Sequence, residues 1–154
     1  MKQIKKLLIL SVILCVLNIQ VTASAAFWNV TGEKMIHDPS IIKEGNSWYV
    51  FGTGEAEKNG IRVLRSDNGI NWYTTPVIFP TAPSWWKTYV PNHESNQWAP
   101  DIQYYNGRYW LYYSVSSFGS NNSLIGLLST ESITSGQWRD DGLVVRSTSS
   151  SNFN

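Results

Sequence analysis

Short runs in which hydrophobic and polar residues alternate occupy most of the chain beyond residue 35, and this pattern predicts β-strands. Residues 40–55, SIIKEGNSWYVFGTGE, indicate a strand, a turn around Gly45 and a second strand that starts near Trp48. Residues 60–75, GIRVLRSDNGINWYTT, repeat this arrangement with a turn at residues 67–69, Asp-Asn-Gly, which tolerate positive φ. No stretch of ten residues shows the 3.6-residue period of an amphipathic helix, so the sequence predicts an all-β fold.

The segment of residues 75–97 has a different character, because it carries four of the six prolines and few alternating runs. This pattern is typical of a long connection, and long loops on a β scaffold are often functional. Two adjacent indoles on the segment, Trp85 and Trp86, leave two interpretations open. They form a platform for a sugar ring, or they cover the edge of a sheet.

Two segments of the chain share one arrangement, HDPSIIKEGNSWYVFGTGE and, further along, WAPDIQYYNGRYWLYYSVS. Each has an aspartate beside a proline, a short strand, a turn that contains glycine, and an aromatic strand. The offset is 63 residues between Asp38 and Asp101, and 62 residues between Gly45 and Gly107. The sequence therefore contains an internal repeat.

Four strands that recur at this spacing, with a tryptophan near the last strand of each set, predict β-propeller blades near residues 36–75 and 98–147. A four-stranded blade buries its faces only against neighbouring blades around a ring, and two blades cannot close a ring. We therefore expect residues 26–154 to be the N-terminal part of a longer propeller. The alternative is a small domain of two β-sheets with a frayed C-terminal tail.

The first 25 residues differ from the rest of the chain and predict a secretory signal peptide. A basic opening, MKQIKK, precedes the apolar core LLILSVILCVLNI and a small-residue end, which allows cleavage after Ala25 and a mature N-terminus at Ala26. The apolar run is shorter than the ~20 residues that span a bilayer, which disfavours the alternative of a signal anchor. We expect a secreted protein without membrane contact after cleavage.

Removal of this segment changes the composition of the chain. The single cysteine, Cys15, leaves with it, which excludes an intramolecular disulfide from the exported protein. Three lysines leave as well, so 9 basic residues remain against 11 acidic ones, and this balance gives no electrostatic reason to expect a nucleic-acid partner. All 8 tryptophans and 8 tyrosines remain, and because flat aromatic faces stack on sugar rings we expect a carbohydrate partner.

Two aspartates stand at the heads of the repeated segments, Asp38 between His37 and Pro39, and Asp101 after Pro100. The first strand of a propeller blade lines the central channel, so both carboxylates would face a shared cavity. Glycoside hydrolysis needs paired carboxylates, one that acts on water or sugar and one that protonates the leaving oxygen. A structural interpretation stays open, because aspartate beside proline is common where a turn or strand begins. The histidine is interpreted as structural.

Three motifs in order, HDPSII, W-A-P-D at residues 98–101 and YYSVSSFG at residues 112–119, resemble the endo-arabinanases of glycoside hydrolase family 43. The resemblance covers nearly all of residues 35–154. It implies a five-bladed β-propeller of which this chain covers about two blades. It also implies hydrolysis of the polysaccharide α-1,5-linked L-arabinan with inversion of configuration.

By the same resemblance, Asp38 matches the general base of these enzymes. Trp98 matches a tryptophan near the bound sugar, and Phe118 and Gly119 match positions that line the substrate cleft. Asn154 matches the asparagine of an N-A-I-D-P motif that opens the third blade. The implied substrate-binding residues are therefore Trp98, Phe118, Gly119 and Asn154, with Trp85, Trp86 and Asp101 as further candidates.

The sequence departs from the family pattern at its C-terminal end. The aspartate that tunes the catalytic acid, the acid glutamate itself and a histidine near the central metal would all lie beyond Asn154. Asp101 does not match the second catalytic carboxylate, and it is interpreted as a residue that lines the channel, supports the structure or faces substrate. We expect these residues alone to be inactive and to hold no metal, and the resemblance admits a calcium ion in the central channel of the whole protein.

Two further functions stay open. Exo-acting arabinofuranosidases and β-xylosidases of the same family share the Asp-Pro opening, although the YYSVSSFG run favours the endo-acting branch. A non-catalytic carbohydrate-binding protein is the alternative from a different class, with Trp85, Trp86 and Trp98 stacking on sugar.

Overall fold

A computed structural model of the 154-residue chain describes residues 29–54, 60–79, 81–93 and 97–151. The predicted signal peptide, the predicted mature N-terminus at Ala26 and the candidate residue Asn154 lie outside these ranges. Within the ranges, no helix is long and apolar enough to cross a membrane.

Sheet 1 has the strand order β1-β5-β4-β3-β2. Its strands are β1 (Thr31–Gly32), β2 (Ser40–Glu44), β3 (Ser47–Gly52), β4 (Arg62–Ser66) and β5 (Asn71–Thr74). Strands β2 to β5 pair antiparallel with their chain neighbours, while β1 lies parallel to β5. The predicted turn at residues 67–69 is confirmed, because the Asn68 side-chain oxygen accepts hydrogen bonds from the N–H groups of Ile70 and Asn71 at 2.9 and 2.8 Å.

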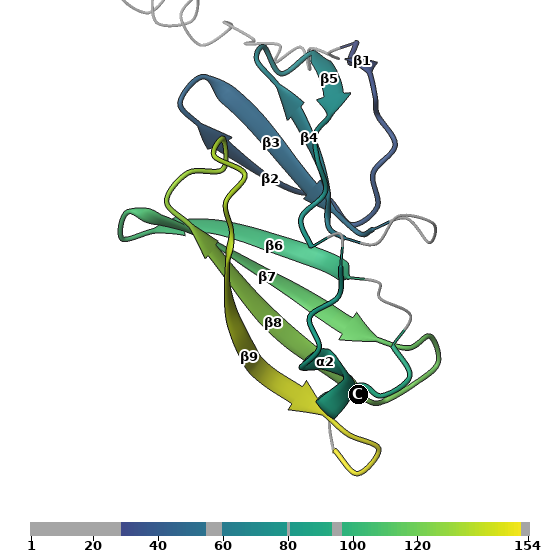
Figure 1. Ribbon diagram of the computed structural model, residues 1–154. Coiled ribbons are helices and arrows are strands. Elements are labelled where there is room, and N and C mark those ends of the chain that lie inside the picture. The colour runs from purple at the N-terminus through teal and green to yellow at the C-terminus, as the bar shows by residue number, and fades with distance from the viewer. Residues whose placement is uncertain (1–28, 55–59, 80, 94–96, 152–154) are drawn as a thin grey trace, which may run out of the picture.

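Sheet 2 is an antiparallel meander in the order β6-β7-β8-β9. Its strands are β6 (Trp98–Tyr105), β7 (Arg108–Ser116), β8 (Ser123–Thr130) and β9 (Arg139–Ser147). Among its described residues, the connection between the sheets contains one short helix, α2 (Trp86–Tyr89), within the stretch predicted as a long loop. The two sheets confirm the prediction of an all-β fold (Figure 1).

The hydrophobic core lies between the two sheets. Alternation along β3 and β7 turns Phe51 and Leu111 into this core, and both are fully buried. Burial of a side chain of this size contributes about 1.5–3 kcal/mol relative to leaving it exposed. The other almost fully buried hydrophobic members are Ile61, Trp86, Val90, Tyr113, Val115, Leu124 and Leu128. Because the core takes residues from both sheets, neither sheet buries its inner face without the other.

The opposite face of sheet 2 has no second sheet against it in the described part of the chain. Cross-strand pairing places Tyr112 beside Leu127, and Val145 beside Ile125, on this face. Tyr112 is 37% exposed and Val145 is 48% exposed. We call these four residues the outer face of sheet 2. A contiguous apolar surface of this kind is typical of a face that another layer covers.

The hairpins that open the two sheets align differently from the predicted repeat. In the first hairpin the glycine is the first of two turn residues, Gly45, whereas in the second it is the second turn residue, Gly107. Matching Gly45 with Gly107 is therefore wrong by one residue, and the same offset would match Trp48 of β3 with Trp110 of β7. Since side chains alternate between the faces of a strand, the two tryptophans point to non-equivalent faces of their sheets.

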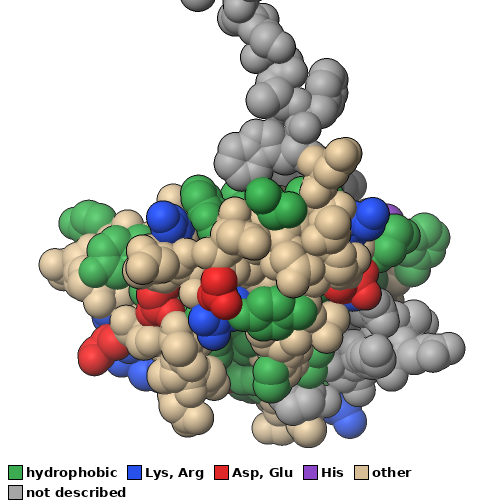
Figure 2. Space-filling model, turned by 90° about the horizontal axis from the view of Figure 1, so that it is seen from above, with side chains coloured by type: hydrophobic (Ala, Val, Ile, Leu, Met, Phe, Trp, Pro, Cys, Tyr) green, Lys and Arg blue, Asp and Glu red, His purple; other side chains and the backbone are tan. Residues whose placement is uncertain are grey.

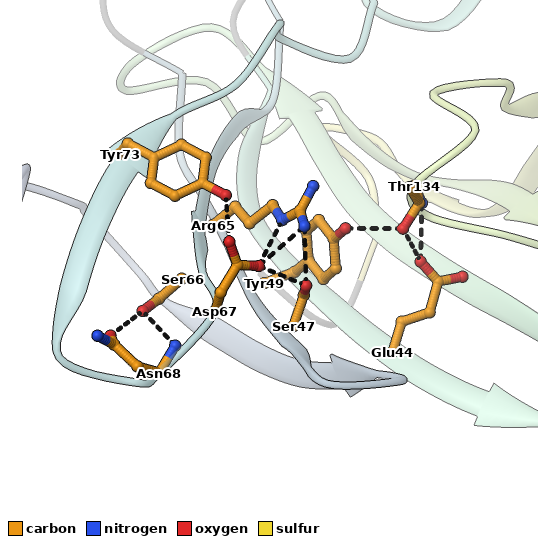
Figure 3. A network of polar contacts seen from close by, with 9 residues as sticks. All are labelled: Glu44, Ser47, Tyr49, Arg65, Ser66, Asp67, Asn68, Tyr73 and Thr134. Atoms are coloured by element: carbon orange, nitrogen blue, oxygen red, sulfur yellow. Dashed lines mark hydrogen bonds and ion pairs between the residues drawn. The ribbon is translucent and has the colours of Figure 1, made fainter.

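Polar contacts join the first hairpin of sheet 1 to the turn that follows β8 (Figure 3). The Glu44 carboxylate accepts hydrogen bonds from the backbone N–H groups of Ile133 and Thr134, at 2.9 and 2.8 Å, and from the Thr134 hydroxyl at 2.5 Å. The Tyr49 hydroxyl lies 2.8 Å from the same hydroxyl oxygen. Burial by itself would raise the pKa of Glu44, but the hydrogen bonds outweigh it and the pKa is lowered. We call this contact the Glu44 clamp.

Charged side chains of both signs lie on the face of the molecule that Figure 2 shows. Figure 2 shows acidic and basic groups interspersed with hydrophobic and neutral polar ones on one face. Ion pairs between neighbouring charged side chains include Arg65 with Asp67 at 2.8 Å and Arg108 with Glu131 at 2.7 Å. No single sign of charge dominates this face of the described residues.

Candidate active site

Asp38 lies in the segment that leads into β2, outside the hydrogen-bonded ladder of sheet 1. Its backbone has a φ of 49°, in the left-handed region that costs most non-glycine residues roughly 1–2 kcal/mol, although aspartate visits it more readily than most. The side chain is exposed to solvent. Residues held in sparsely populated conformations cluster at functional sites, so this aspartate is the first candidate for chemistry.

Thr53, the first residue after β3, holds this segment by its backbone and by its side chain. Its N–H donates to the His37 carbonyl at 2.9 Å, and its hydroxyl donates to Oδ2 of Asp38 at 2.5 Å. The same hydroxyl oxygen accepts a hydrogen bond from the backbone N–H of Ala99 at 3.0 Å. Ala99 belongs to β6 of sheet 2 and has a φ of 44°. Thr53 therefore connects the candidate carboxylate to the other sheet.

Gly52 makes room for the segment that carries Asp38. A Cβ atom on Gly52 would lie 2.6 Å from the His37 carbonyl oxygen and 2.2 Å from Cγ1 of Ile36. Real side chains do not approach a backbone atom this closely, so only glycine allows the segment to pack against the end of β3. The position of Asp38 thus depends on the lack of a side chain at Gly52 as well as on the hydroxyl of Thr53.

Asp101 has a different environment, because it lies within β6 and faces the start of β2. Its Oδ1 accepts hydrogen bonds from the Ser40 hydroxyl at 3.2 Å and from the Gln103 amide at 3.4 Å. Ser40 also accepts a hydrogen bond from the Ile102 N–H at 3.1 Å. These contacts hold β2 of sheet 1 beside β6 of sheet 2, although the two strands belong to different sheets. They support the structural interpretation of Asp101 among those left open.

The other predicted cleft residues gather at one end of sheet 2. Trp98 begins β6, is half-buried, and its carbonyl accepts a hydrogen bond from the Ser114 hydroxyl at 3.0 Å. Since Trp98 pairs with Ser114 near the end of β7, the turn after β7 lies at the same end. That turn carries Phe118, which is 94% exposed, and Gly119, which has a φ of 75°. The link from Thr53 to Ala99 meets sheet 2 at this end.

The two indoles of the connecting segment are placed differently from each other. Trp86 is fully buried, and its Nε1 donates to the Tyr113 hydroxyl at 3.3 Å. The sugar-platform interpretation does not fit Trp86 in this structure, because no face of its ring reaches solvent; it covers sheet 2 instead. Trp85 is half-buried, and its Nε1 donates to Asp140 at 2.8 Å, which orients the ring toward β9.

Between sheet 1 and the turn after β8 lies a cavity of about 530 Å³. Its walls include Tyr49, Phe51, Arg65 and Trp138, and none of its lining residues is an aspartate, glutamate or histidine. The cavity therefore offers no carboxylate or imidazole for acid–base chemistry.

Three residues that hold these carboxylates were not predicted from the sequence: Thr53, Ser40 and Gly52. Hydroxyl residues are common in β proteins, and nothing in their spacing distinguishes a serine or threonine that crosses between sheets from one that faces water. One signal was available, because a glycine inside a strand pattern often marks a close backbone approach, and Gly52 ends an aromatic strand.

Comparison with known proteins gives the site its context. The family model for glycosyl hydrolases family 43 matches residues 27–153. The chain is 63% identical, over 132 residues, to the extracellular endo-α-(1→5)-L-arabinanase 1 of Bacillus subtilis, covering 86% of this chain and 41% of that protein. It is 38% identical, over 116 residues, to the extracellular exo-α-(1→5)-L-arabinofuranosidase of Cellvibrio japonicus, covering 73% of this chain and 32% of that protein.

Solved structures agree with the sequence comparison. An endo-arabinanase of Bacillus licheniformis superposes with a TM-score of 0.79 at 70% identity, covering 83% of this chain and 43% of that structure. A Cellvibrio cellulosa α-L-arabinanase complexed with arabinohexaose superposes with a TM-score of 0.66 at 37% identity, covering 73% of this chain and 36% of that structure. The chain thus spans about two fifths or less of these relatives. Since the family model covers most of its length, the chain belongs to glycosyl hydrolases family 43.

Proposed function

We propose that this chain is the N-terminal part of a secreted endo-arabinanase that hydrolyses α-1,5-linked L-arabinan with inversion of configuration. The observation that carries the proposal is the identity of 70% and 63% to two endo-arabinanases, each over more than four fifths of the chain. Two exo-acting relatives are 38% and 35% identical, in the range of other endo-acting relatives at 34% and 30%, so the two highest identities alone support endo action.

In this proposal Asp38 is the general base. The Thr53 hydroxyl engages Oδ2 of the carboxylate, and Oδ1 takes the proton of the water that attacks the anomeric carbon. General-base assistance contributes about 10²–10⁴-fold in rate. A carboxylic acid supplied from outside the described residues protonates the leaving oxygen, and in inverting enzymes the two carboxyl groups stand roughly 6.5–9.5 Å apart to admit the water.

Substrate binding is assigned to the end of sheet 2 that meets Thr53. Trp98 and the strongly exposed Phe118 offer aromatic faces for stacking on sugar rings. Gly119 lies next to Phe118 in the same turn and has a positive φ, which glycine adopts without strain. Asn154 is the further proposed contact. The arabinohexaose complex of the Cellvibrio relative supports a cleft that accepts several sugar units.

The proposed architecture is a five-bladed propeller in which strands β2–β5 and β6–β9 are the first two blades. The exposed apolar outer face of sheet 2 supports it, because a third blade would cover Tyr112 and Val145. The described residues contain no group of three or more His, Cys, Asp or Glu side chains placed to hold a metal ion. None of the residues named above is therefore assigned to the proposed calcium ion of the central channel.

Secretion belongs to the proposal as well, with cleavage after Ala25. Two relatives carry the word extracellular in their names, which supports this assignment. N-terminal sequencing of the exported protein should begin at Ala26, and material that begins at Met1 would contradict the assignment.

The decisive experiment is a chimera in which residues 27–154 replace the matching part of the Bacillus licheniformis endo-arabinanase, to which the chain is 70% identical. We expect the chimera to cut linear arabinan into a mixture of oligosaccharides, measured by a fall in viscosity and by chromatography. NMR should show the inverted anomer as the first product. Release of a single short product indicates exo action, and binding without hydrolysis indicates a carbohydrate-binding protein.

Residues 26–154 without the remainder of the propeller are proposed to be inactive, and either unstable or self-associating. Their outer face on sheet 2 stays in water, where each Å² of apolar surface forfeits roughly 25 cal/mol, and they lack the acid. Sedimentation and arabinan hydrolysis test this directly. A cooperative monomer that matches the activity of the chimera would contradict the proposal and return Asp101 to consideration as the acid.

A further inference from the structure

We infer that Thr53 is a positioning residue for Asp38, with a hydroxyl that orients the carboxylate only when the two sheets are packed together. The inference deepens the proposed function and rests on it, because it assigns a second residue to the general base. It comes from two hydrogen bonds, which run from the Ala99 amide through the Thr53 hydroxyl to the Asp38 carboxylate.

The direction of these hydrogen bonds is fixed by the chemistry of the groups. A backbone N–H can only donate, so the Thr53 oxygen is the acceptor of the 3.0 Å contact with Ala99. An ionised carboxylate can only accept, so the single hydroxyl proton of Thr53 goes to Oδ2 of Asp38, at 2.5 Å. No second arrangement of protons satisfies both partners. Consecutive hydrogen bonds of this kind also polarise one another, which strengthens the contact to the carboxylate.

Three features of the surrounding chain restrict the position of the Thr53 hydroxyl. The Thr53 N–H donates to the His37 carbonyl at 2.9 Å, which fixes the distance between its backbone and the segment of Asp38. The side chain of threonine is branched at Cβ and therefore has few accessible rotamers. Gly52, the preceding residue, lets the same segment approach β3 closely. The Asp38 side chain is exposed, so these contacts rather than burial determine its orientation.

Ser40 provides a matched control within the same molecule. Its hydroxyl also accepts a hydrogen bond from an amide of sheet 2, that of Ile102 at 3.1 Å, and also donates to a carboxylate. The carboxylate is Asp101 and not Asp38. If hydroxyl bridges serve only to hold the sheets together, loss of either one has the same consequence. If Thr53 positions the base, only its loss slows the reaction.

The experiment compares Thr53→Val, Thr53→Ser and Ser40→Ala in the chimera of residues 27–154 with the Bacillus licheniformis enzyme. Valine keeps the shape of threonine and removes the hydroxyl, whereas serine restores the hydroxyl. We expect Thr53→Val to lower kcat on linear arabinan about 10–100-fold with KM nearly unchanged, since misplacement of a catalytic group by an ångström costs up to about 10²-fold. Thr53→Ser should recover kcat to within about threefold of the parent, and Ser40→Ala should leave it within the same range.

Crystal structures of the two Thr53 variants supply a readout that does not need activity. The Asp38 carboxylate should keep its position in Thr53→Ser and leave it in Thr53→Val. An unmoved carboxylate in Thr53→Val, a kcat lost equally in Thr53→Val and Ser40→Ala, or a failure of Thr53→Ser to restore kcat would each overturn the inference. A parent chimera that does not hydrolyse arabinan refutes the proposed function instead, and the position of Asp38 in the crystals then still decides the role of Thr53.

Discussion

Two aspartates lie near the junction of the sheets, Asp38 just before β2 and Asp101 within β6. Beside each aspartate, a hydroxyl group from the first part of the chain accepts a hydrogen bond from a backbone amide of sheet 2. The two carboxylates differ in where they lie. Asp38 precedes β2 and has a strained backbone, and its carboxylate accepts a hydrogen bond from Thr53, which follows β3 of the same sheet. Asp101 lies inside β6, and its carboxylate accepts a hydrogen bond from the hydroxyl of Ser40 in the other sheet.

The two carboxylates also differ in which parts of the molecule their hydrogen bonds join. The Asp101 oxygen that meets Ser40 also meets Gln103, so its contacts serve the junction of the sheets. Within the described residues, the Asp38 carboxylate accepts a hydrogen bond from the Thr53 hydroxyl on Oδ2, and the residue is exposed. A general base needs both fixed orientation and access to water. Both aspartates are exposed, so the location of their hydrogen bonds, and not access to water, distinguishes them.

The largest expected effect comes from Asp38→Asn in the chimera. The asparagine amide oxygen still accepts a hydrogen bond from the Thr53 hydroxyl, but it is too weak a base to remove a proton from water. We therefore expect kcat to fall about 10²–10⁴-fold while the protein stays folded. Asp101→Asn is the matched variant, and it should change kcat by less than about threefold. Rates on linear arabinan together with thermal unfolding measure both. Equal losses for the two variants would abolish the distinction between the two aspartates.

A smaller effect is expected from Gly52→Ala. The new Cβ would overlap the His37 carbonyl oxygen, so the segment of Asp38 must move. Overpacking of this type costs about 1–3 kcal/mol in the free energy of unfolding, and the displaced base should lower kcat about tenfold or more. Urea unfolding and steady-state kinetics of the chimera give both values.

Gly45→Asn is the control for that substitution. Gly45 has a φ of 57° with no atom within 4 Å of an added Cβ, and the second hairpin carries Asn106 at the equivalent turn position with a φ of 50°. We expect unchanged kcat and a stability within about 0.5 kcal/mol of the parent. If Gly52→Ala behaves like Gly45→Asn, the close approach at Gly52 does not position Asp38.

The smallest effect concerns the Glu44 clamp, a third carboxylate at the junction of the sheets. Its pKa is lowered in the folded protein, so the clamp stabilises fully above the ordinary glutamate value of 4.5 and loses its contribution as the pH falls through the lowered pKa. Glu44→Gln should therefore cost about 1–2 kcal/mol near neutral pH and progressively less under acid conditions. Denaturant unfolding at several pH values measures this difference.

Glu131→Gln serves as the control for the clamp, because Glu131 pairs with Arg108 through a side chain that is 77% exposed. A surface pair of this type contributes about 0–1 kcal/mol. A pH dependence that is the same in both variants would show that the Glu44 clamp does not respond to acid as a partly buried junction. Neither substitution should alter kcat, which separates these carboxylates from Asp38.

The strands and turns were predictable because they depend on local pattern. Alternation identified β3 and β7, and Asp-Asn-Gly identified the turn whose Asn68 side chain caps two backbone amides. The repeat was found but aligned one residue out, since glycine occupies different places in the two turns. The pair Trp85-Trp86 could not be resolved, because sequence does not say which of two adjacent indoles turns into a core.

The sequence by itself determined the all-β fold, the internal repeat and the family, because strand periodicity and short motifs are written in consecutive residues. Only the tertiary structure decided that the hydroxyl of Thr53 donates to Asp38, that the hydroxyl of Ser40 donates to Asp101 and that Trp86 belongs to the core. These relations join residues 15 to 61 positions apart, and they follow from how two sheets pack. A hydroxyl has the same chemistry wherever it occurs, so its role depends on which donor and which carboxylate the packing brings within hydrogen-bonding distance.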